Sequence, residues 1–335
     1  MKNNVYNLTL KDWEEYFINK NDKKFKGQQV FDWLYRKRVA SFDDMTNIKK
    51  EVIDMLKNDF DIKTVSITKV ERDVDVNKYL FKLKDDEKVE AVLMNHLYGN
   101  SLCISTQVGC NMGCKFCESG RLKKVRNLET HEMIEQILLV EEECGKRISH
   151  VVVMGIGEPF DNYDNLVRFI EIINNPKGLE LGSRHITVST CGVVPKIKEF
   201  MKLPYQVNLA ISLHAPNNEI RNTIMPINKA YPIEVLMATL NEYIKETNRR
   251  VTFEYILLDG VNDTAECAQE LANLVKGMNC YINETNNISY KRTKSLNISK
   301  FYDILKKNRI NVTIRREYGS NISAACGQLR SKKED

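Results

Sequence analysis

Three cysteines stand close together in the segment GCNMGCKFC, and their spacing has the clearest chemical meaning in this sequence. Cys110, Cys114 and Cys117 follow a C-x3-C-x2-C pattern. Structural zinc usually takes four closed ligands, typically two C-x2-C pairs, and no second pair is visible here. Three clustered thiolates instead suit a [4Fe–4S] cluster that leaves one iron without a protein ligand. Such an iron can chelate a substrate and deliver one electron to it.

The elements that must position these cysteines alternate between apolar strands and amphipathic helices. Strands are expected at 102–105, 150–155, 185–190, 207–214, 251–258 and 280–283, and helices near 130–144, 163–174, 193–202, 232–246, 264–276 and 298–308. This alternation predicts a parallel sheet with right-handed crossovers. Six units are too few for a closed eight-unit barrel, so the expected fold class is α/β, a partial (βα)6 TIM-like barrel.

Small and polar residues follow three successive predicted strands. A strand-end Ser or His is more often a cap or a core hydrogen-bonding group, but the coincidence at three strands favours a ligand site. Ligands of such folds bind at the carboxyl ends of the strands. Glycine lets a backbone approach a ligand closely, and a carboxylate suits a bound ammonium. The candidate cofactor-binding residues are Gly157, Glu158, Ser189, Ser212, Leu213 and His214.

The composition describes a globular chain with two parts. It has 335 residues, 42% of them hydrophobic, and a net charge of +5. Residues 1–85 show apolar residues at helical spacing and are expected to form a small helical accessory domain. Residues 86–335 are expected to hold a small β extension, the barrel and a carboxyl-terminal segment. No run approaches the roughly 18 apolar residues of a membrane span, and no signal peptide is visible, so we expect a cytoplasmic protein.

Nine cysteines without a secretory signal indicate reduced thiols, metal ligands or catalysis. Cys144, Cys267 and Cys280 lie in apolar contexts and are interpreted as small core residues. Cys103 and Cys326 would each, taken alone, also be interpreted as structural.

The longer motifs resemble a known family. The C-x3-C-x2-C loop with Phe116 before its third cysteine resembles the radical S-adenosylmethionine superfamily, whose members fold as partial barrels. The resemblance to the dual-specificity RNA adenine methyltransferases of that superfamily rests on LCISTQVGCNMGCKFC, VVVMGIGEPFDNYDN, HITVSTCGVVPK, ISLHAPNNEIRNTIMPINKAYP, VTFEYILLDGVNDTAE and VTIRREYGSNISAACGQLR. It extends to the amino-terminal helical stretch. It implies methylation of C2 of an adenosine in the peptidyl transferase centre of 23S ribosomal RNA, and of the adenosine beside certain tRNA anticodons.

The resemblance also implies why two distant cysteines are needed. Adenine C2 lies between two ring nitrogens and is electrophilic, so it cannot attack a methyl sulfonium directly. In the implied mechanism one S-adenosylmethionine methylates Cys326, and a second is cleaved at the cluster to a radical that takes a hydrogen from the new methyl group. The resulting carbon radical adds to adenine. Loss of a ring proton and attack of Cys103 on Cys326 then release the product with a transient disulfide.

Further residues and partners follow from the same resemblance. Glu90 occupies the place of a family glutamate that contacts the adenine or accepts a proton; the alternative is a surface strand carboxylate. Asn287, with Asn286 equally arguable, corresponds to an asparagine that helps to bind S-adenosylmethionine. The implied partners are 23S rRNA and tRNA, held by the basic helices and hairpin of residues 1–100, and a one-electron reductant such as flavodoxin. The protein is expected to be a monomer that does not bind membranes.

The sequence departs from the family at three places. Glu118 replaces a small residue after the third cysteine, Cys191 stands where Ser is common, and the NLIPxN type of segment is absent after Ile282. The nearest rival is the resistance methyltransferase that modifies C8 of the same rRNA adenosine. After the second strand that group tends to have GEA, whereas this sequence has GEP, so Pro159 favours the C2 enzyme. A rival of another class is a non-catalytic RNA-binding protein in which Cys110, Cys114 and Cys117 bind a structural metal ion.

Overall fold

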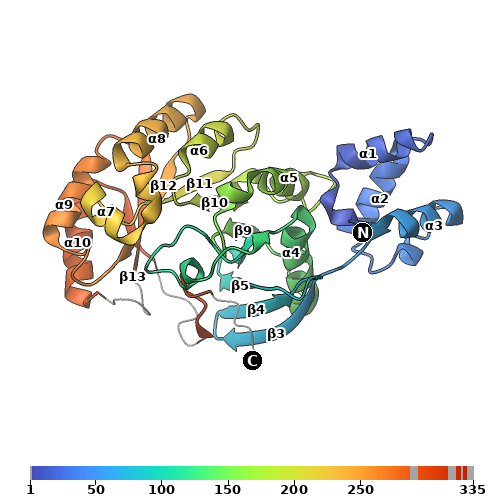
Figure 1. Ribbon diagram of the computed structural model, residues 1–335, viewed down its shortest axis with the longest axis horizontal. Helices are drawn as coiled ribbons and strands as arrows, with labels where there is room; N and C mark the ends of the chain where they lie inside the picture. The colour runs from blue at the N-terminus through green and yellow to red at the C-terminus, as the bar shows by residue number, and fades with distance from the viewer. Residues whose placement is uncertain (1, 287–292, 316–321, 326, 330–335) are drawn as a thin grey trace.

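A ten-stranded sheet forms the centre of the molecule (Figure 1). The computed structural model describes residues 2–286, 293–315, 322–325 and 327–329. The strand order is β14-β13-β12-β11-β10-β9-β6-β5-β4-β3. Its parallel part consists of β6 (Gly99–Cys103), β9 (His150–Val153), β10 (Ile186–Thr190), β11 (Asn208–Ser212), β12 (Val251–Leu257), β13 (Cys280–Asn286) and β14 (Val312–Ile314). The sheet has two ends in the described chain, so it forms a partial barrel rather than a closed one.

An antiparallel extension continues the sheet beyond β6. It consists of β3 (Ser66–Asp73), β4 (Val76–Lys82) and β5 (Lys88–His96), joined by hairpins. The expected small β extension is therefore present, although β3 and β4 precede residue 86, where the catalytic part was expected to begin.

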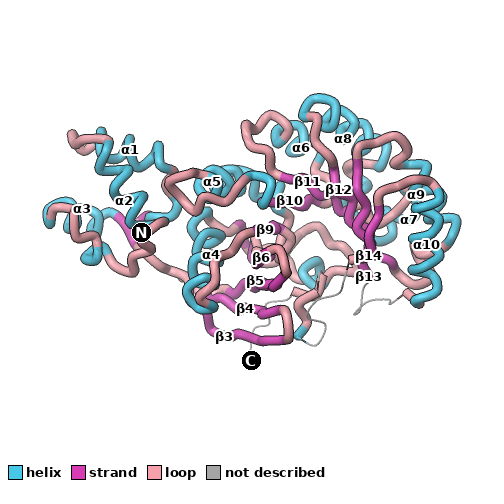
Figure 2. Tube along the Cα trace, turned by 180° about the vertical axis from the view of Figure 1, so that it is seen from behind, coloured by secondary structure: helices cyan, strands magenta, loops and turns pink. Residues whose placement is uncertain are grey.

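Helices cover the outer face of the curved sheet, as Figure 2 shows. They are α4 (Thr130–Cys144), α5 (Tyr163–Asn174), α6 (Val194–Phe200), α8 (Ile233–Thr247), α9 (Ala265–Leu274) and α10 (Ser295–Lys307). The short α7 (Asn218–Ile224) instead lies at the carboxyl ends of β10 and β11. All six predicted strands and all six predicted helices of the barrel are present, with ends displaced by a few residues. Short α7 and β14 were not predicted, because elements of this length carry too little hydrophobic periodicity.

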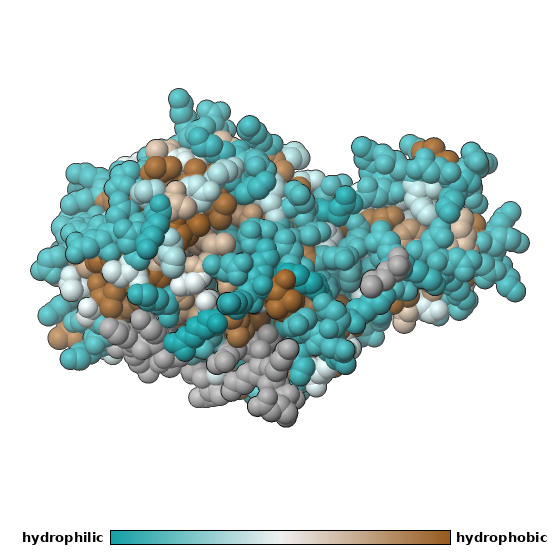
Figure 3. Space-filling model, viewed as in Figure 1, coloured by the Kyte–Doolittle hydropathy of each residue, from teal (hydrophilic) through white to brown (hydrophobic). Residues whose placement is uncertain are grey.

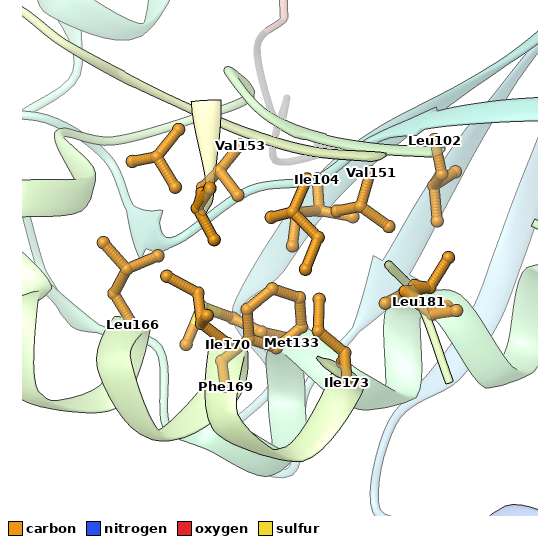
Figure 4. Packing of buried hydrophobic residues seen from close by; sticks show 14 of the residues in the cluster. Leu102, Ile104, Met133, Val151, Val153, Leu166, Phe169, Ile170, Ile173 and Leu181 are labelled. Atoms are coloured by element: carbon orange, nitrogen blue, oxygen red, sulfur yellow. The ribbon is translucent and has the colours of Figure 1, made fainter. Parts of the chain in front are cut away.

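Side chains from alternate strand positions pack against these helices and so determine which residues face the barrel interior. Leu102, Ile104, Val151 and Val153 are fully buried and meet Phe169 and its neighbours from α4 and α5 (Figure 4). Each such burial contributes roughly 1.5–3 kcal/mol. Because strand side chains alternate between faces, the intervening positions point inward.

The amino-terminal part is a helical unit at one end of the molecule (Figure 1). It contains α1 (Leu10–Asn19), α2 (Phe25–Tyr35) and α3 (Lys50–Asp59), and β1 (Asn3–Asn4) pairs in parallel with β2 (Phe60–Asp61). Thr9 and Asp12 form a capping box at the start of α1. Its aromatic core is continuous with that of the barrel. The predicted helical character of this region is confirmed.

No helix within the described ranges is both long and apolar enough to cross a membrane.

Candidate active site

The cysteine loop begins and ends at a short strand pair. β7 (Gln107–Val108) pairs with β8 (Arg126–Asn127), and the loop between them is held by internal hydrogen bonds. The Cys110 amide donates to the Leu122 carbonyl (3.1 Å), and the Cys117 amide donates to the Cys114 carbonyl (3.2 Å). All three cysteines line one cavity that opens to solvent and has about 840 Å³ of space unfilled by protein atoms.

The ends of the neighbouring strands bring most of the predicted cofactor-binding residues to the same cavity. Those that line it are Gly157, Glu158, Ser189, Ser212 and His214. Leu213 is fully buried in the apolar core and is not among the lining residues. The reason is the alternation of side chains: Ser212 and His214 face inward, so Leu213 between them faces the helices.

Glu158 is a buried carboxylate held by backbone amides at the inner edge of the cavity. Its Oε1 accepts from the Phe160 amide (3.0 Å) and its Oε2 from the Cys191 amide (2.8 Å). Burial raises the pKa of Glu158, and these hydrogen bonds act in the opposite direction. A cationic group bound beside it would favour the ionised form, so the position suits an ammonium ligand.

Gly157 precedes this carboxylate and approaches β7 closely. Its φ is +109°, and a Cβ at this position would lie 2.7 Å from Cβ and Cγ of Gln107. Only glycine fits this backbone without displacement of its neighbours.

His214 presents a neutral imidazole to the cavity. Burial lowers its pKa to about 3, and its Nδ1 accepts from the Ile256 amide (3.1 Å), which places the proton on Nε2. The edge of Phe116 contacts the ring at a centroid distance of 4.8 Å. With a φ of +56°, His214 occupies the left-handed region, an arrangement that non-glycine residues adopt mainly where tertiary contacts enforce it.

Two of the three thiols of the loop, those of Cys110 and Cys114, are in a desolvated environment. Burial raises the pKa of Cys110 to about 12 and also raises that of Cys114, with the neighbouring cysteines and Glu158 as further causes. Thiolates here therefore need a bound positive charge, which metal ligation supplies. The described residues contain no group of three or more His, Cys, Asp or Glu side chains gathered around a single ion position. A [4Fe–4S] cluster does not need such a group, because each thiolate binds a different iron.

Two of the sequence departures now have a structural setting. The carboxylate of Glu118 forms an ion pair with Arg121 (3.1 Å), so its charge beside the loop has a partner. Cys191 is buried and lines the cavity at the end of β10.

Cys103 lies inside the barrel on β6, next to the carboxyl-terminal segment. It is 7% exposed and belongs to an apolar cluster with Val92, Ala324 and Leu329. The same segment is tied to the cysteine loop, since the Glu118 amide donates to the Gly327 carbonyl (2.7 Å) and Ser119 Oγ donates to the Leu329 carbonyl (2.8 Å). Residues on both sides of position 326 therefore contact the site. Cys326 and Asn287 themselves lie outside the described residues, and of Asn286 only the backbone, in β13, is described.

Glu90 is buried on β5 rather than exposed. Its carboxylate lies 3.6 Å from Lys78 Nζ, and its carbonyl accepts from Ser105 Oγ (2.6 Å). It is not among the residues that line the cavity.

Several cavity residues were not predicted. Thr285 and Arg315 lie at the ends of β13 and β14, whereas Glu254 lies in the middle of β12. Glu254 accepts from Asn283 Nδ2 (2.9 Å) and lies 3.8 Å from Arg315. A carboxylate within the apolar strand VTFEYIL was a signal that could have identified Glu254.

Of the three cysteines interpreted as core residues, Cys267 and Cys280 are buried and Cys144 is partly exposed. No two of the eight described cysteines are joined to each other by a disulfide.

Comparisons with known proteins agree with this site. The radical SAM superfamily model matches residues 104–275, and the ribosomal RNA large subunit methyltransferase N-terminal domain model matches residues 3–62. A "Probable dual-specificity RNA methyltransferase RlmN" of Spiroplasma citri is 54% identical over 319 residues, covering 93% of this chain and 92% of that protein. The chain belongs to the RlmN-type dual-specificity RNA methyltransferases of the radical SAM superfamily. A protein of the same description from Enterococcus faecalis is 52% identical, covering 99% and 97%.

A solved relative of this family has the same fold. The crystal structure of a radical SAM methyltransferase from Sphaerobacter thermophilus superimposes with a TM-score of 0.93 at 38% identity, covering 98% of this chain and 99% of that one. Membership of the radical SAM family implies a [4Fe–4S] cluster and S-adenosylmethionine as cofactors. The three thiols that line one cavity together with Gly157 and Glu158 fit that implication.

Proposed function

We propose that this enzyme methylates C2 of an adenosine in the peptidyl transferase centre of 23S rRNA and the adenosine beside the anticodon of certain tRNAs. The observation that supports this most strongly is the convergence of two distant segments. The residues flanking position 326 contact both the cysteine loop, through the Glu118–Gly327 hydrogen bond, and the surroundings of Cys103. A cluster site next to Cys103 and to the neighbours of position 326 suits the methyl-cysteine route. A non-catalytic protein that binds a metal only for stability would not need this arrangement.

The strand ends provide the cofactor site in this proposal. Cys110, Cys114 and Cys117 hold the cluster, which when bound supplies the single electron that cleaves S-adenosylmethionine. The buried carboxylate of Glu158 and the close backbone of Gly157 receive the methionyl ammonium, because a desolvated carboxylate attracts a cation strongly. Serine hydroxyls and the neutral imidazole provide hydrogen bonds without adding charge. In this group are Ser189, Ser212 and His214.

In this proposal Cys326 carries the methyl group and Cys103 releases the product. The Cys326 sulfur takes a methyl group from one S-adenosylmethionine by displacement and loses its proton, and a second S-adenosylmethionine is consumed in each turnover. The deoxyadenosyl part of that second molecule would take a hydrogen atom from the Cys326 methyl group before the carbon bond to adenine forms. The adduct then loses one electron, which the oxidised cluster would accept, and the ring proton, with Glu90 as acceptor or adenine contact. The Cys103 thiolate next attacks the Cys326 sulfur. That attack breaks the bond between the Cys326 sulfur and the product carbon, which takes up a proton to become the methyl group. It leaves a disulfide, which cellular thiols reduce.

RNA binding is assigned to the amino-terminal part. Residues 1–85 form the accessory domain and residues 86–335 the catalytic domain in this proposal, with β3 and β4 contributing to the catalytic sheet as well. Figure 3 shows that the amino-terminal unit presents a largely hydrophilic face, and Lys20, Lys23 and Lys24 are exposed between α1 and α2. Such cations bind phosphates independently of sequence. We further propose a flavodoxin-type electron donor, action as a monomer, and a cytoplasmic location.

The test uses anaerobic, cluster-reconstituted protein with methyl-labelled S-adenosylmethionine and a 23S RNA fragment, followed by mass spectrometry of the nucleosides. 2-Methyladenosine is the expected product. 8-Methyladenosine would instead support the alternative activity, C8 methylation that causes ribosome-targeting antibiotic resistance, and would mean that Pro159 does not discriminate. A colourless protein with stoichiometric zinc would exclude both.

A cysteine variant separates the methyl carrier from the cofactor site. Cys326→Ala should still cleave S-adenosylmethionine slowly while forming no methylated RNA. Cys144→Ala is the matched control, since Cys144 lies at the end of α4 and away from the cavity. Methylated RNA from Cys326→Ala would remove this residue from the mechanism.

A further inference from the structure

A fully buried arginine lies beneath the cysteine loop. Arg221, on α7, has no solvent exposure, and it is the one buried cation among the lysines and arginines that the structure describes. Its helix contacts the loop directly, because the Lys115 amide donates to the Ile224 carbonyl (3.0 Å). Ile224 packs with Phe116 and Cys191 in the apolar cluster around the site.

The guanidinium forms four hydrogen bonds, all of them to neutral acceptors. Its Nε donates to the Leu213 carbonyl (3.1 Å), its Nη2 to the carbonyls of Cys191 (2.7 Å) and Ser212 (3.2 Å), and its Nη1 to Asn228 Oδ1 (2.9 Å). Within the described part of the chain, no carboxylate pairs with it. These bonds connect the ends of β10 and β11, which carry the residues proposed to hold S-adenosylmethionine.

An unpaired buried charge is unfavourable unless a negative charge lies nearby. Burial lowers the pKa of Arg221, and electrostatic attraction to Cys191 and Cys114 acts in the opposite direction. Cys114 is one of the three thiols assigned to the cluster, and thiolates bring negative charge to this place once they bind iron. The buried cation and the buried thiolates therefore complement each other, although they come from different segments of the chain.

We propose that Arg221 is the buried counter-charge of the iron–sulfur cluster, a positioning residue that also raises the reduction potential of the cluster. The proposal rests on the proposed function, because it requires the cluster. Potentials of such clusters depend on the charge and hydrogen bonds around them, and a nearby cation favours the more negative, reduced state.

The test measures the midpoint potential of the reconstituted holoenzyme without S-adenosylmethionine, by redox titration followed with electron paramagnetic resonance. Arg221→Gln should make reduction at least about tenfold less favourable, which is about 59 mV for a one-electron couple. Arg221→Lys keeps the charge and should stay within roughly threefold of the wild type, although it loses hydrogen bonds.

A second variant keeps the arginine in place. Asn228→Asp puts a carboxylate where Nη1 now donates to an amide oxygen, so it should neutralise the guanidinium and shift the potential in the same direction as Arg221→Gln. If both variants carry a full cluster at the wild-type potential, Arg221 is only structural and the proposal is wrong. If the wild type itself binds no [4Fe–4S] cluster, the proposed function fails and this inference fails with it. Cluster binding by the wild type therefore distinguishes failure of the inference alone from failure of the proposed function.

Discussion

Replacement of Gly157 by alanine tests the geometry of the site most directly. This residue lines the cavity directly before the buried carboxylate of Glu158. Its φ is +109°, and the added Cβ would lie 2.7 Å from two carbons of Gln107 and 2.9 Å from Thr106 Oγ1. Gln107 cannot move cheaply, because its side chain is buried and bonds to the Glu158 amide (2.9 Å), to Asn127 (2.8 Å) and to Asp161 (2.9 Å).

Two costs contribute to the expected loss of stability. A non-glycine residue held in a sparsely populated backbone region costs about 1–3 kcal/mol. An extra methyl group in a well-packed region costs about 1–3 kcal/mol more. We therefore expect Gly157→Ala to lower the free energy of unfolding by roughly 2–6 kcal/mol. Relief of the contact would move the backbone away from Gln107 and displace Glu158, so affinity for S-adenosylmethionine should fall by at least about tenfold.

Two other glycines provide matched controls. Gly145 has a φ of +64°, but no atom lies within 4 Å of the Cβ that alanine would add, so Gly145→Ala isolates the backbone cost. Gly182 has neither constraint, and Gly182→Ala should be neutral or slightly stabilising. The assays are denaturant unfolding of the apoprotein and calorimetric binding of S-adenosylmethionine to the reconstituted protein. If Gly157→Ala unfolds within about 0.5 kcal/mol of Gly145→Ala, the steric argument is refuted.

Three further predictions concern titration and covalent chemistry. Burial without a hydrogen-bond donor among the described residues raises the pKa of Glu284 from 4.5 to about 8. The folded state therefore retains a proton that the unfolded state loses, so wild-type stability should fall relative to Glu284→Gln between pH 4.5 and 8, by up to roughly 5 kcal/mol. A constant difference across that pH range would contradict this. His214 should show no imidazole titration by NMR between pH 5 and 8, with His214→Gln used to assign its signal; a midpoint near 6.5 would mean that the ring is solvated. Cys103→Ala should accumulate protein covalently attached to RNA in cells, whereas Cys144→Ala should not, and RNase-treated Cys103→Ala protein without an attached nucleotide would exclude the resolving role.

The sequence by itself determined the features that depend on local order along the chain. The spacing of Cys110, Cys114 and Cys117 places them on one loop whatever surrounds it. The alternation of apolar strands and amphipathic helices is sufficient to predict a parallel sheet, because such strands must be covered on both faces. Residues at strand ends meet at one edge of that sheet, and Gly157, Glu158, Ser189, Ser212 and His214 could therefore be assigned together.

The tertiary structure alone decided which side chains reach the cavity and which distant segments meet there. Leu213 was assigned with its neighbours, but the pleat turns it toward the helices. The carboxylate of Glu254 in an apolar strand was a local signal, but its place in the cavity depends on the pairing of β12 with β11. Arg221 reaches the site only because α7 packs against the cysteine loop. The contact of Ala324 with the cluster around Cys103 joins positions more than two hundred residues apart. Such contacts come from long-range pairing and from the burial of apolar surface, and neither leaves a periodic signal in the sequence.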